Sequence, residues 1–256
     1  MLGAIIGDLI GSRFEGQNSK STEFDLFTDK SAFTDDSVLT VATADCILNQ
    51  KGYTKVYQEY GKKYPNAGYG GTFYKWIFSD NPKPYNSWGN GSAMRVSPVA
   101  YAFNDLETVL EEAQKSAEVT HNHPEGIKGA QAVASAVFLA RTGKNKAEIK
   151  DYIQAKFGYD LERTLDEIRP VYRFDVSCQG SVPEAIIAFI ESADFESAIR
   201  LSISLGGDSD TIAAMAGSIA EAFYKEIPEK MISETKKRLP DEFLEIIKRF
   251  IERFYR

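Results

Sequence analysis

The sequence predicts an all-α protein folded as one compact multi-helix domain over residues 1–256. Apolar side chains recur at spacings of three and four along most of the chain, which is the pattern of a helix that buries one face. Strand candidates are few, and the best of them, Val171–Phe174, is short. The chain has no internal repeat, low-complexity stretch or Pro/Gly/Ser-rich linker, and it is long enough for one large hydrophobic core. These features favour a single domain over two.

After the N-terminal segment, the apolar spacing predicts seven further helices. The helix that starts at Pro124 has its proline in the first turn, where a missing N–H is tolerated, and continues into small residues suited to close packing. The helix that ends at Tyr224 is rich in Ala and Gly, and the last helix is charged and amphipathic. The predicted ranges are Ser37–Leu48, Leu106–Ser116, Pro124–Arg141, Ser181–Ser192, Phe195–Leu205, Thr211–Tyr224 and Pro240–Tyr255.

Several glycines occupy helical positions where alanine would favour the helix by about 1 kcal/mol. Gly3, Gly7 and Gly11 repeat every four residues, so they share one face of the N-terminal helix. Gly129 and Gly217 lie inside two later helices. Close approach between helices explains such positions, and we therefore expect the N-terminal helix to be central.

Composition and charge exclude several classes of protein. The net charge of -7 and the pI near 5.1 argue against a surface for nucleic acid or anionic membranes. Two His and two Cys are too few for a His- or Cys-rich zinc site, and Cys46 and Cys178 are expected to be free thiols. The apolar N-terminal stretch is short, lacks a basic start and is interrupted by Asp8. We therefore expect a cytoplasmic protein with no membrane association.

Two clusters of carboxylates each precede an apolar helix, FTDDS at residues 33–37 and GGDSDT at residues 206–211. Helix capping would account for one such side chain per helix, whereas each cluster supplies two Asp and a Thr. If the clusters meet in a buried place, their charges would repel unless cations neutralised them. Oxygen ligands of this kind suit Mg²⁺, Mn²⁺ or Ca²⁺, and two divalent cations would match four Asp. Capping alone stays open as the alternative, since nothing local proves that the clusters meet.

A glycine-rich loop, Ser87–Arg95, leads into a further helix. Its alternating glycines would let successive N–H groups point at one place, which suits a phosphate, although such a loop can also be a simple turn. Trp88 could stack on a flat base or belong to the core. The loop Gly68–Gly71 is similarly permissive. His121 and His123 could cap the helix that follows them or contact a ligand.

At these motifs the chain resembles a known family. The order GDLIGSRFEG, FTDDS, GNGSAMR, THNHP and GGDSDT closely resembles the ADP-ribosylglycohydrolase family, and the likeness runs from about residue 1 to residue 224. The resemblance implies a compact all-α fold with a binuclear Mg²⁺ or Mn²⁺ centre at the bottom of a cleft. It also implies a hydrolase that cleaves the ribose C1 glycosidic bond of ADP-ribosylated substrates, releases ADP-ribose and so reverses mono-ADP-ribosylation.

The same resemblance implies roles for individual residues. Glu15 is expected near the metals and the scissile ribose, and Asp35 and Asp36 also belong to the catalytic set. The chemistry leaves three roles open for Glu15, a general base, a carboxylate that orients water, or a metal ligand in one state. Trp88 is expected to stack on adenine, and Ser87–Met94 to hold the diphosphate. The implied metal ligands are Thr34, Asp35, Asp36, Asp208, Asp210 and Thr211. The implied substrate-binding residues are Tyr69, Gly70, Gly71, Ser87, Trp88, Gly89, Asn90, Gly91, Ser92, Met94 and His121.

The bond to be cleaved indicates what the site must do. Cleavage at ribose C1 passes through an oxocarbenium-like state, and cations on the ribose hydroxyls would fix the sugar. The expected partners of a monomeric enzyme are ADP-ribose and an ADP-ribosylated substrate, taken to be protein, with nucleic-acid-linked ADP-ribose left open. Whether the acceptor is arginine, serine, O-acetyl or nucleic acid also stays open. The alternatives are a catalytically silent ADP-ribose-binding or structural relative, or a binuclear metallophosphatase.

Overall fold

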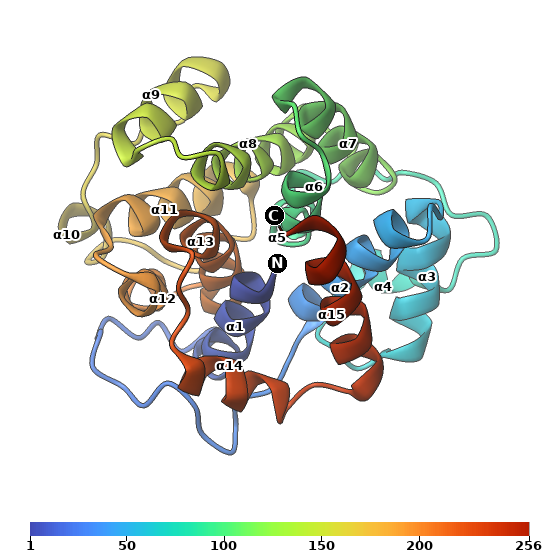
Figure 1. The fold of residues 1–256 in the computed structure, drawn as a ribbon, viewed down its shortest axis with the longest axis horizontal. Coiled ribbons are helices and arrows are strands. Elements are labelled where there is room, and N and C mark those ends of the chain that lie inside the picture. Colours follow the sequence, from blue (N-terminus) through green and yellow to red (C-terminus); the bar gives the residue numbers. More distant parts are fainter. Residues whose placement is uncertain (256) are drawn as a thin grey trace.

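The computed structural model describes residues 1–255, which form helices joined by turns and loops (Figure 1). Within this range there is no strand, and Gly89 and Ser177 form the one isolated β-bridge. The all-α prediction is therefore confirmed. The elements are α1 (Leu2–Gly11), the 3-10 helix η1 (Ser12–Phe14), α2 (Asp35–Leu48), α3 (Tyr53–Lys63), α4 (Gly71–Ile77), α5 (Gly91–Met94), α6 (Ser97–Ala102), α7 (Leu106–Glu118), α8 (Pro124–Arg141), α9 (Lys146–Phe157), α10 (Leu165–Ile168), α11 (Cys178–Glu191), α12 (Phe195–Ile203), α13 (Ser209–Tyr224), α14 (Glu229–Lys236) and α15 (Asp241–Phe254).

Helices α1 and α13 lie side by side in the middle of the molecule (Figure 1). A Cβ atom added at Gly3 would lie 2.3 Å from the carbonyl oxygen of Gly217, and one at Gly7 would lie 2.2 Å from that of Ala213. Any larger side chain would therefore collide with backbone. Every residue of α1 is buried, so this helix is central, as its glycine pattern predicts.

The remaining helices surround this pair. Helix α8 packs against α7, α11 and α13, while α2 contacts α1, α3 and α15. Their apolar faces join in one continuous hydrophobic core, which makes the described chain a single compact helical domain. Among residues 1–255, no helix is both long enough and apolar enough to cross a membrane.

The predicted helix boundaries agree with the structure to within a few residues, and α8 has the predicted range. Helix α11 begins at Cys178 instead of Ser181, because the Ser177 side chain caps it by accepting the N–H of Gly180. Cys46 and Cys178 are buried free thiols, as expected. The predictions omit the short helices α4, α10 and α14 as well as α3 and α9, whose sequences are largely polar and which bury three residues each.

The predicted strand Val171–Phe174 is wrong. This segment is a loop after α10, and the Val171 and Phe174 side chains are 72% and 51% exposed. A strand needs a neighbouring strand to pair its backbone groups, and none lies beside this segment within the described chain. Its carbonyls find other partners, since that of Tyr172 accepts from Lys20 Nζ at 3.0 Å.

Candidate functional site

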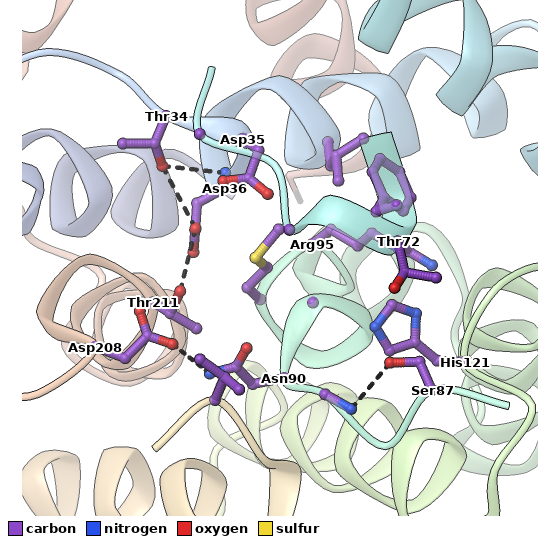
Figure 2. Close-up of a pocket in the computed structure, with 18 of the residues that line it drawn as sticks. Thr34, Asp35, Asp36, Thr72, Ser87, Asn90, Arg95, His121, Asp208 and Thr211 are labelled. Atoms are coloured by element: carbon purple, nitrogen blue, oxygen red, sulfur yellow. Dashed lines mark hydrogen bonds between the residues drawn. The ribbon is translucent and has the colours of Figure 1, made fainter. Parts of the chain in front are cut away.

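A cleft of about 600 Å³ lies where the loops before α2, α4, α5 and α13 converge (Figure 2). Segments distant in the sequence meet here because each of these helices points its N-terminal end towards the same space. Of the predicted site residues, Tyr69 and Ser92 do not line the cleft. Those that do are Glu15, Thr34, Asp35, Asp36, Gly70, Gly71, Ser87, Trp88, Gly89, Asn90, Gly91, Met94, His121, Asp208, Asp210 and Thr211.

The two predicted carboxylate clusters meet on one side of the cleft (Figure 2). Thr211 Oγ1 donates to Asp36 Oδ2 at 3.2 Å, which links the first turn of α13 to that of α2. Thr34 also caps α2 by accepting the N–H of Asp36. Capping and convergence therefore both hold at α2, whereas Asp208, the N-cap residue of α13, makes no side-chain capping bond.

Gly206 and Gly207 set the direction in which α13 begins. Their φ angles are 71° and 72°, a left-handed conformation that other residues rarely adopt. A Cβ at Gly207 would also lie 2.9 Å from the carbonyl oxygen of Arg173. The tight turn that results places Asp208 beside Asn90, whose Nδ2 donates to Asp208 Oδ2 at 2.7 Å.

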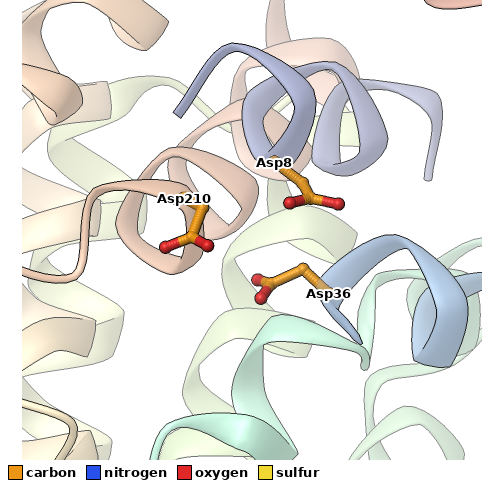
Figure 3. A group of neighbouring side chains, drawn as sticks. All are labelled: Asp8, Asp36 and Asp210. Atoms are coloured by element: carbon orange, nitrogen blue, oxygen red, sulfur yellow. The ribbon is translucent and has the colours of Figure 1, made fainter. Parts of the chain in front are cut away.

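A further buried carboxylate, Asp8, completes this group and was not among the predicted site residues (Figure 3). It accepts the Thr34 N–H at 2.9 Å, the Thr34 hydroxyl at 2.7 Å and the Ser37 N–H at 3.1 Å, as well as the Ser37 hydroxyl. Asp8 thereby ties α1 to the start of α2. The sequence contained the signal, since a lone carboxylate inside the otherwise apolar run GAIIGDLIG needs polar partners when buried.

The carboxylates form two adjoining groups that share Asp210. Oxygen atoms of Asp8, Asp36 and Asp210 lie within 4.8 Å of one another, and so do those of Glu15, Asp208 and Asp210. Asp36 Oδ1 is buried and has no hydrogen-bond partner within the described chain. A set of oxygen donors with an unpartnered buried carboxylate oxygen fits Mg²⁺ or Mn²⁺ and does not fit zinc.

Charge repulsion in this group is reflected in the pKa values. Burial and then the neighbouring Asp8 and Asp208 raise the pKa of Asp35 to about 8. Burial and Asp210 hold the pKa of Asp36 well above its usual range. Burial, Asp208 and Asp8 also raise the pKa of Glu15. No ion pair joins these carboxylates to a lysine or arginine in residues 1–255, so cations would relieve the repulsion.

The loop Ser87–Arg95 forms the next part of the cleft wall. Its Gly89 N–H donates to Ser87 Oγ at 3.2 Å, and its Asn90 N–H donates to the Val176 carbonyl at 2.8 Å. Ser92 is buried and its hydroxyl donates to the Gly126 carbonyl at 2.7 Å, so Ser92 fixes the loop and does not face the cleft. The Trp88 side chain is 49% exposed at the cleft, which excludes the core interpretation of this residue.

The two histidines have different roles. His123 Nδ1 accepts the N–H of Glu125 and caps α8, whereas the buried His121 lines the cleft. Burial, followed by the nearby Arg95, holds the pKa of His121 well below its usual range, so its imidazole is neutral. Tyr69 packs on the ring of Phe73, which itself lines the cleft, and Tyr69 is not among the lining residues.

Several lining residues were not among the predicted ones. Arg95 closes the motif GNGSAMR and Gly68 opens the loop Gly68–Gly71, so both could have been found there, while the others stand in sequence contexts without a recognisable pattern. Phe174 ends the segment that was predicted as a strand, and Val176 follows it in the same loop. The additional lining residues are Leu39, Gly68, Thr72, Phe73, Tyr85, Asn86, Arg95, Phe174 and Val176.

The fold and the cleft define a class of protein. It is an all-helical protein whose cleft brings clustered carboxylates together with a glycine-rich loop and an exposed tryptophan, which suits a hydrolase that acts on a nucleotide-like ligand. The family follows from sequence. The chain belongs to the ADP-ribosylglycohydrolase family, whose sequence model matches residues 1–256.

Individual relatives agree with this assignment. The chain is 31% identical to ADP-ribosylhydrolase ARH3 of Mus musculus, in a match that covers 90% of this chain and 84% of that protein. It is 29% identical to ADP-ribosylarginine hydrolase Tri1 of Pseudomonas putida, over 53% of this chain and 38% of the relative. The chain is therefore an enzyme, a glycosidic-bond hydrolase of the ADP-ribosylhydrolase type.

A solved structure also shares the fold. It is described as an ADP-ribosylglycohydrolase-related protein complex and has a TM-score of 0.76 with 23% sequence identity. The match covers 98% of this chain and 95% of that one. The family's all-α architecture is therefore confirmed for this chain.

Proposed function

We propose that this enzyme hydrolyses the bond between ribose C1 and the acceptor in mono-ADP-ribosylated protein, with two divalent cations, Mg²⁺ or Mn²⁺, in its cleft. The observation that carries the proposal is the pair of carboxylate groups that share Asp210 beside the glycine-rich loop. Relatives named ADP-ribosylhydrolase and ADP-ribosylarginine hydrolase support the choice of substrate.

The surroundings of the carboxylates indicate which of them would hold the cations. Asp36, Asp208 and Asp210 are buried at the cleft, and Asp36 Oδ1 has no partner among residues 1–255. The hydroxyls of Thr34 and Thr211 and the carboxylate of Asp35 complete an oxygen-donor set. Asp8 differs, because its two oxygens already accept four hydrogen bonds. We therefore assign Asp8 the role of positioning Thr34 and Ser37.

Bound divalent cations would neutralise the carboxylates, orient the ribose hydroxyls and make a nearby water molecule more acidic. The protein's own residues do the rest. Glu15 lies on the cleft wall beside Asp208 and Asp210, and its raised pKa makes it a better proton acceptor. As the water oxygen forms its bond to C1, the C1–acceptor bond breaks with its electron pair going to the acceptor atom; Glu15 takes the proton that the water releases and passes it to that leaving atom. The remaining carboxylate charge stabilises the positive charge that develops on the sugar.

The opposite part of the cleft is suited to the rest of ADP-ribose. The Trp88 ring offers an exposed flat surface on which adenine can stack. The N–H group of Gly91, which lines the cleft, has no backbone acceptor within the described residues, which leaves it for the diphosphate. Together with Met94 and His121, these residues would hold the ligand while the ribose lies against the carboxylates.

The test is release of free ADP-ribose from substrates of defined linkage. Peptides carrying ADP-ribose on arginine or serine, O-acetyl-ADP-ribose and an ADP-ribosylated oligonucleotide are each incubated with Mg²⁺, with Mn²⁺ and with a chelator. We expect cation-dependent release from a modified peptide and none from the Asp36→Asn variant. Release that persists unchanged after chelation would refute the cation part of the proposal, and no release from any peptide would refute the substrate.

A further inference from the structure

Arg95 is a fully buried guanidinium that pairs with no carboxylate in residues 1–255. It lies beside the cleft, close to Thr72 and His121 (Figure 2). Its Nη2 uses both N–H groups, donating to the Ser116 carbonyl at 2.9 Å and to Thr120 Oγ1 at 3.0 Å. Burying an unpaired guanidinium this deeply lowers the stability of the folded state, so we expect a functional role for this position.

A second set of contacts fixes the plane of this guanidinium. Arg95 lies over the ring of Tyr57, with 4.3 Å between the guanidinium carbon and the ring centre. The Tyr57 hydroxyl in turn lies 2.7 Å from Ser116 Oγ and 2.9 Å from Thr43 Oγ1. Arg95 therefore has one orientation, and its bond to Thr120 has one direction.

The position of the Thr120 proton follows from counting acceptors. Thr120 Oγ1 lies 2.7 Å from His121 Nδ1 and 3.5 Å from the Ala117 carbonyl. The Ala117 carbonyl already accepts three N–H groups, those of His121 at 2.8 Å, of Thr120 at 3.1 Å and of Val119, so its two lone pairs are fully used without the Thr120 hydroxyl. The Thr120 oxygen accepts from Arg95, so its own proton points to the acceptor that remains, which is His121 Nδ1.

We infer that Arg95, acting through Thr120, is a positioning residue that fixes His121 as the tautomer protonated on Nε2. Nε2 lies at the glycine-rich loop, since a Cβ built on Gly91 would be 3.2 Å from it. The imidazole therefore presents a hydrogen-bond donor to the cleft. Given the proposed function, that donor meets an oxygen atom of ADP-ribose next to this loop.

The charge environment agrees with a neutral donor at this place. The aromatic ring of Tyr85 lies 6.0 Å from that of His121, and Arg95 is the charged side chain that acts on the imidazole. Burial and the positive charge of Arg95 both disfavour the imidazolium form. A neutral imidazole donates from only one nitrogen. The hydrogen bonds from Arg95 to Thr120 and from Thr120 to His121, here called the relay, therefore determine which nitrogen carries the proton.

The test is a measurement of the His121 tautomer by nitrogen-15 NMR, made without ligand. The His123→Asn background leaves a single histidine, and asparagine can still cap α8. We expect a protonated Nε2 and a bare Nδ1. Thr120→Val should give a mixture of tautomers and weaken ADP-ribose binding by about fivefold to tenfold, and Thr120→Ser should restore both properties.

A protonated Nδ1 in the His123→Asn protein would overturn the inference, and so would an unchanged tautomer in Thr120→Val. Arg95→Lys keeps a positive charge but loses the forked donor, and we expect mixed tautomers there too. If Arg95→Lys does not fold, the comparison of Thr120→Val with Thr120→Ser still tests the inference. A protein that has the expected tautomer but does not bind ADP-ribose would contradict the proposed function while supporting the relay.

Discussion

Asp8 and Asp36 are neighbouring buried carboxylates with opposite surroundings. Asp8 accepts four hydrogen bonds from Thr34 and Ser37, whereas Asp36 Oδ1 accepts none from the described chain. The four hydrogen bonds offset part of the cost of burying Asp8, whose pKa burial still raises, whereas the unpartnered oxygen of Asp36 beside Asp210 leaves that cost uncompensated until a cation binds. The same residue type thus has a structural role in one place and a ligand role in the other.

This difference predicts opposite effects of the same substitution. With a chelator at pH 8, Asp36→Asn should raise the melting temperature by about 2–4 °C, because it removes a repelling charge worth about 1 kcal/mol. Asp8→Asn should lower stability by about 2–3 kcal/mol, since its amide group would face N–H donors. Adding Mn²⁺ should stabilise the wild type and leave Asp36→Asn unchanged. Thermal denaturation of both variants checks this, and shifts of the same sign would contradict it.

Glu15 is the residue on which the chemistry is predicted to depend most. Glu15→Gln keeps the size of the side chain and removes its ability to accept a proton, so turnover should fall by about 10²–10⁴. ADP-ribose affinity should change little if Glu15 acts only on protons. Single-turnover kinetics together with calorimetry test this. A parallel loss of cation affinity would instead make Glu15 a permanent metal ligand, and full activity would remove it from the mechanism.

Trp88 provides a matching test of binding without chemistry. Because its ring is half exposed at the cleft, Trp88→Ala should leave the fold intact and weaken ADP-ribose binding by about 1–3 kcal/mol. Trp76 is the natural comparison, since it is buried in the core and its loss should lower stability. Calorimetric titration and thermal denaturation of the two variants should therefore give opposite patterns. Equal binding by Trp88→Ala and wild type would refute adenine stacking.

Among the helices, the contact between α1 and α13 determines where the carboxylates stand. Asp8 and Asp210 come from these two helices, and their separation is set by the backbone contact at Gly7 and Gly11. A Cβ at Gly11 would lie 2.5 Å from the Cα atom of Asp210. The glycine face of α1 therefore fixes the geometry of the site as well as the packing of the core.

Gly7→Ala should accordingly be severely destabilising. Its new methyl group would lie 2.2 Å from the Ala213 carbonyl oxygen, and backbone cannot move aside as a side chain can. We expect a loss of about 2–3 kcal/mol or more, although alanine favours helices by about 1 kcal/mol. Gly52→Ala is the control, because nothing lies within 4 Å of a Cβ there. Chemical denaturation compares the two, and equal stabilities would contradict the packing argument.

For the molecule as a whole, the cluster of buried carboxylates makes the free energy of unfolding depend on pH. The pKa of Asp35 is about 8 in the folded chain and near 3.8 when unfolded, so the folded state holds a proton that the unfolded state releases. Raising the pH through that interval therefore lowers stability. His121 has the opposite sign, since its folded pKa is lowered, and its effect is confined to pH values below about 6.5.

The window from pH 6.5 to pH 8 lies above the range of His121, and within it only the buried Met1 amino group, whose pKa is lowered from 8.0 by burial, opposes the effect of the carboxylates among the shifted groups of residues 1–255. In chelator, the melting temperature of the wild type should fall as the pH is raised across this window. The melting temperature of Asp35→Asn should fall less. The stabilisation by Mg²⁺ or Mn²⁺ should be larger at pH 8 than at pH 6.5, because bound cations compete with protons for the same oxygens. Scanning calorimetry at both pH values measures this. A melting temperature that rises with pH in chelator would contradict the raised pKa values.

The all-α class, most helix ranges and the two acidic motifs are encoded locally and could be predicted from the amino-acid order. Apolar spacing, N-cap residues and glycine repeats each act within one helix or one turn. The central place of α1 could also be predicted, because a glycine every four residues lets a second helix approach one face closely. The polar helices α3 and α9 escaped prediction, since their few buried residues give a weak periodic signal.

Which side chains meet depends on the packing of the helices. Asp8 belongs to the carboxylate group because α1 lies against α13, and Arg95 reaches Thr120 because α5 lies near the end of α7. Tyr69 and Ser92 lie in the predicted loops but do not line the cleft. Whether a polar residue belongs to a site or only caps a helix depends on neighbours that are far away in the sequence. The spatial distances to those neighbours are set by helix packing, which no short stretch of sequence encodes.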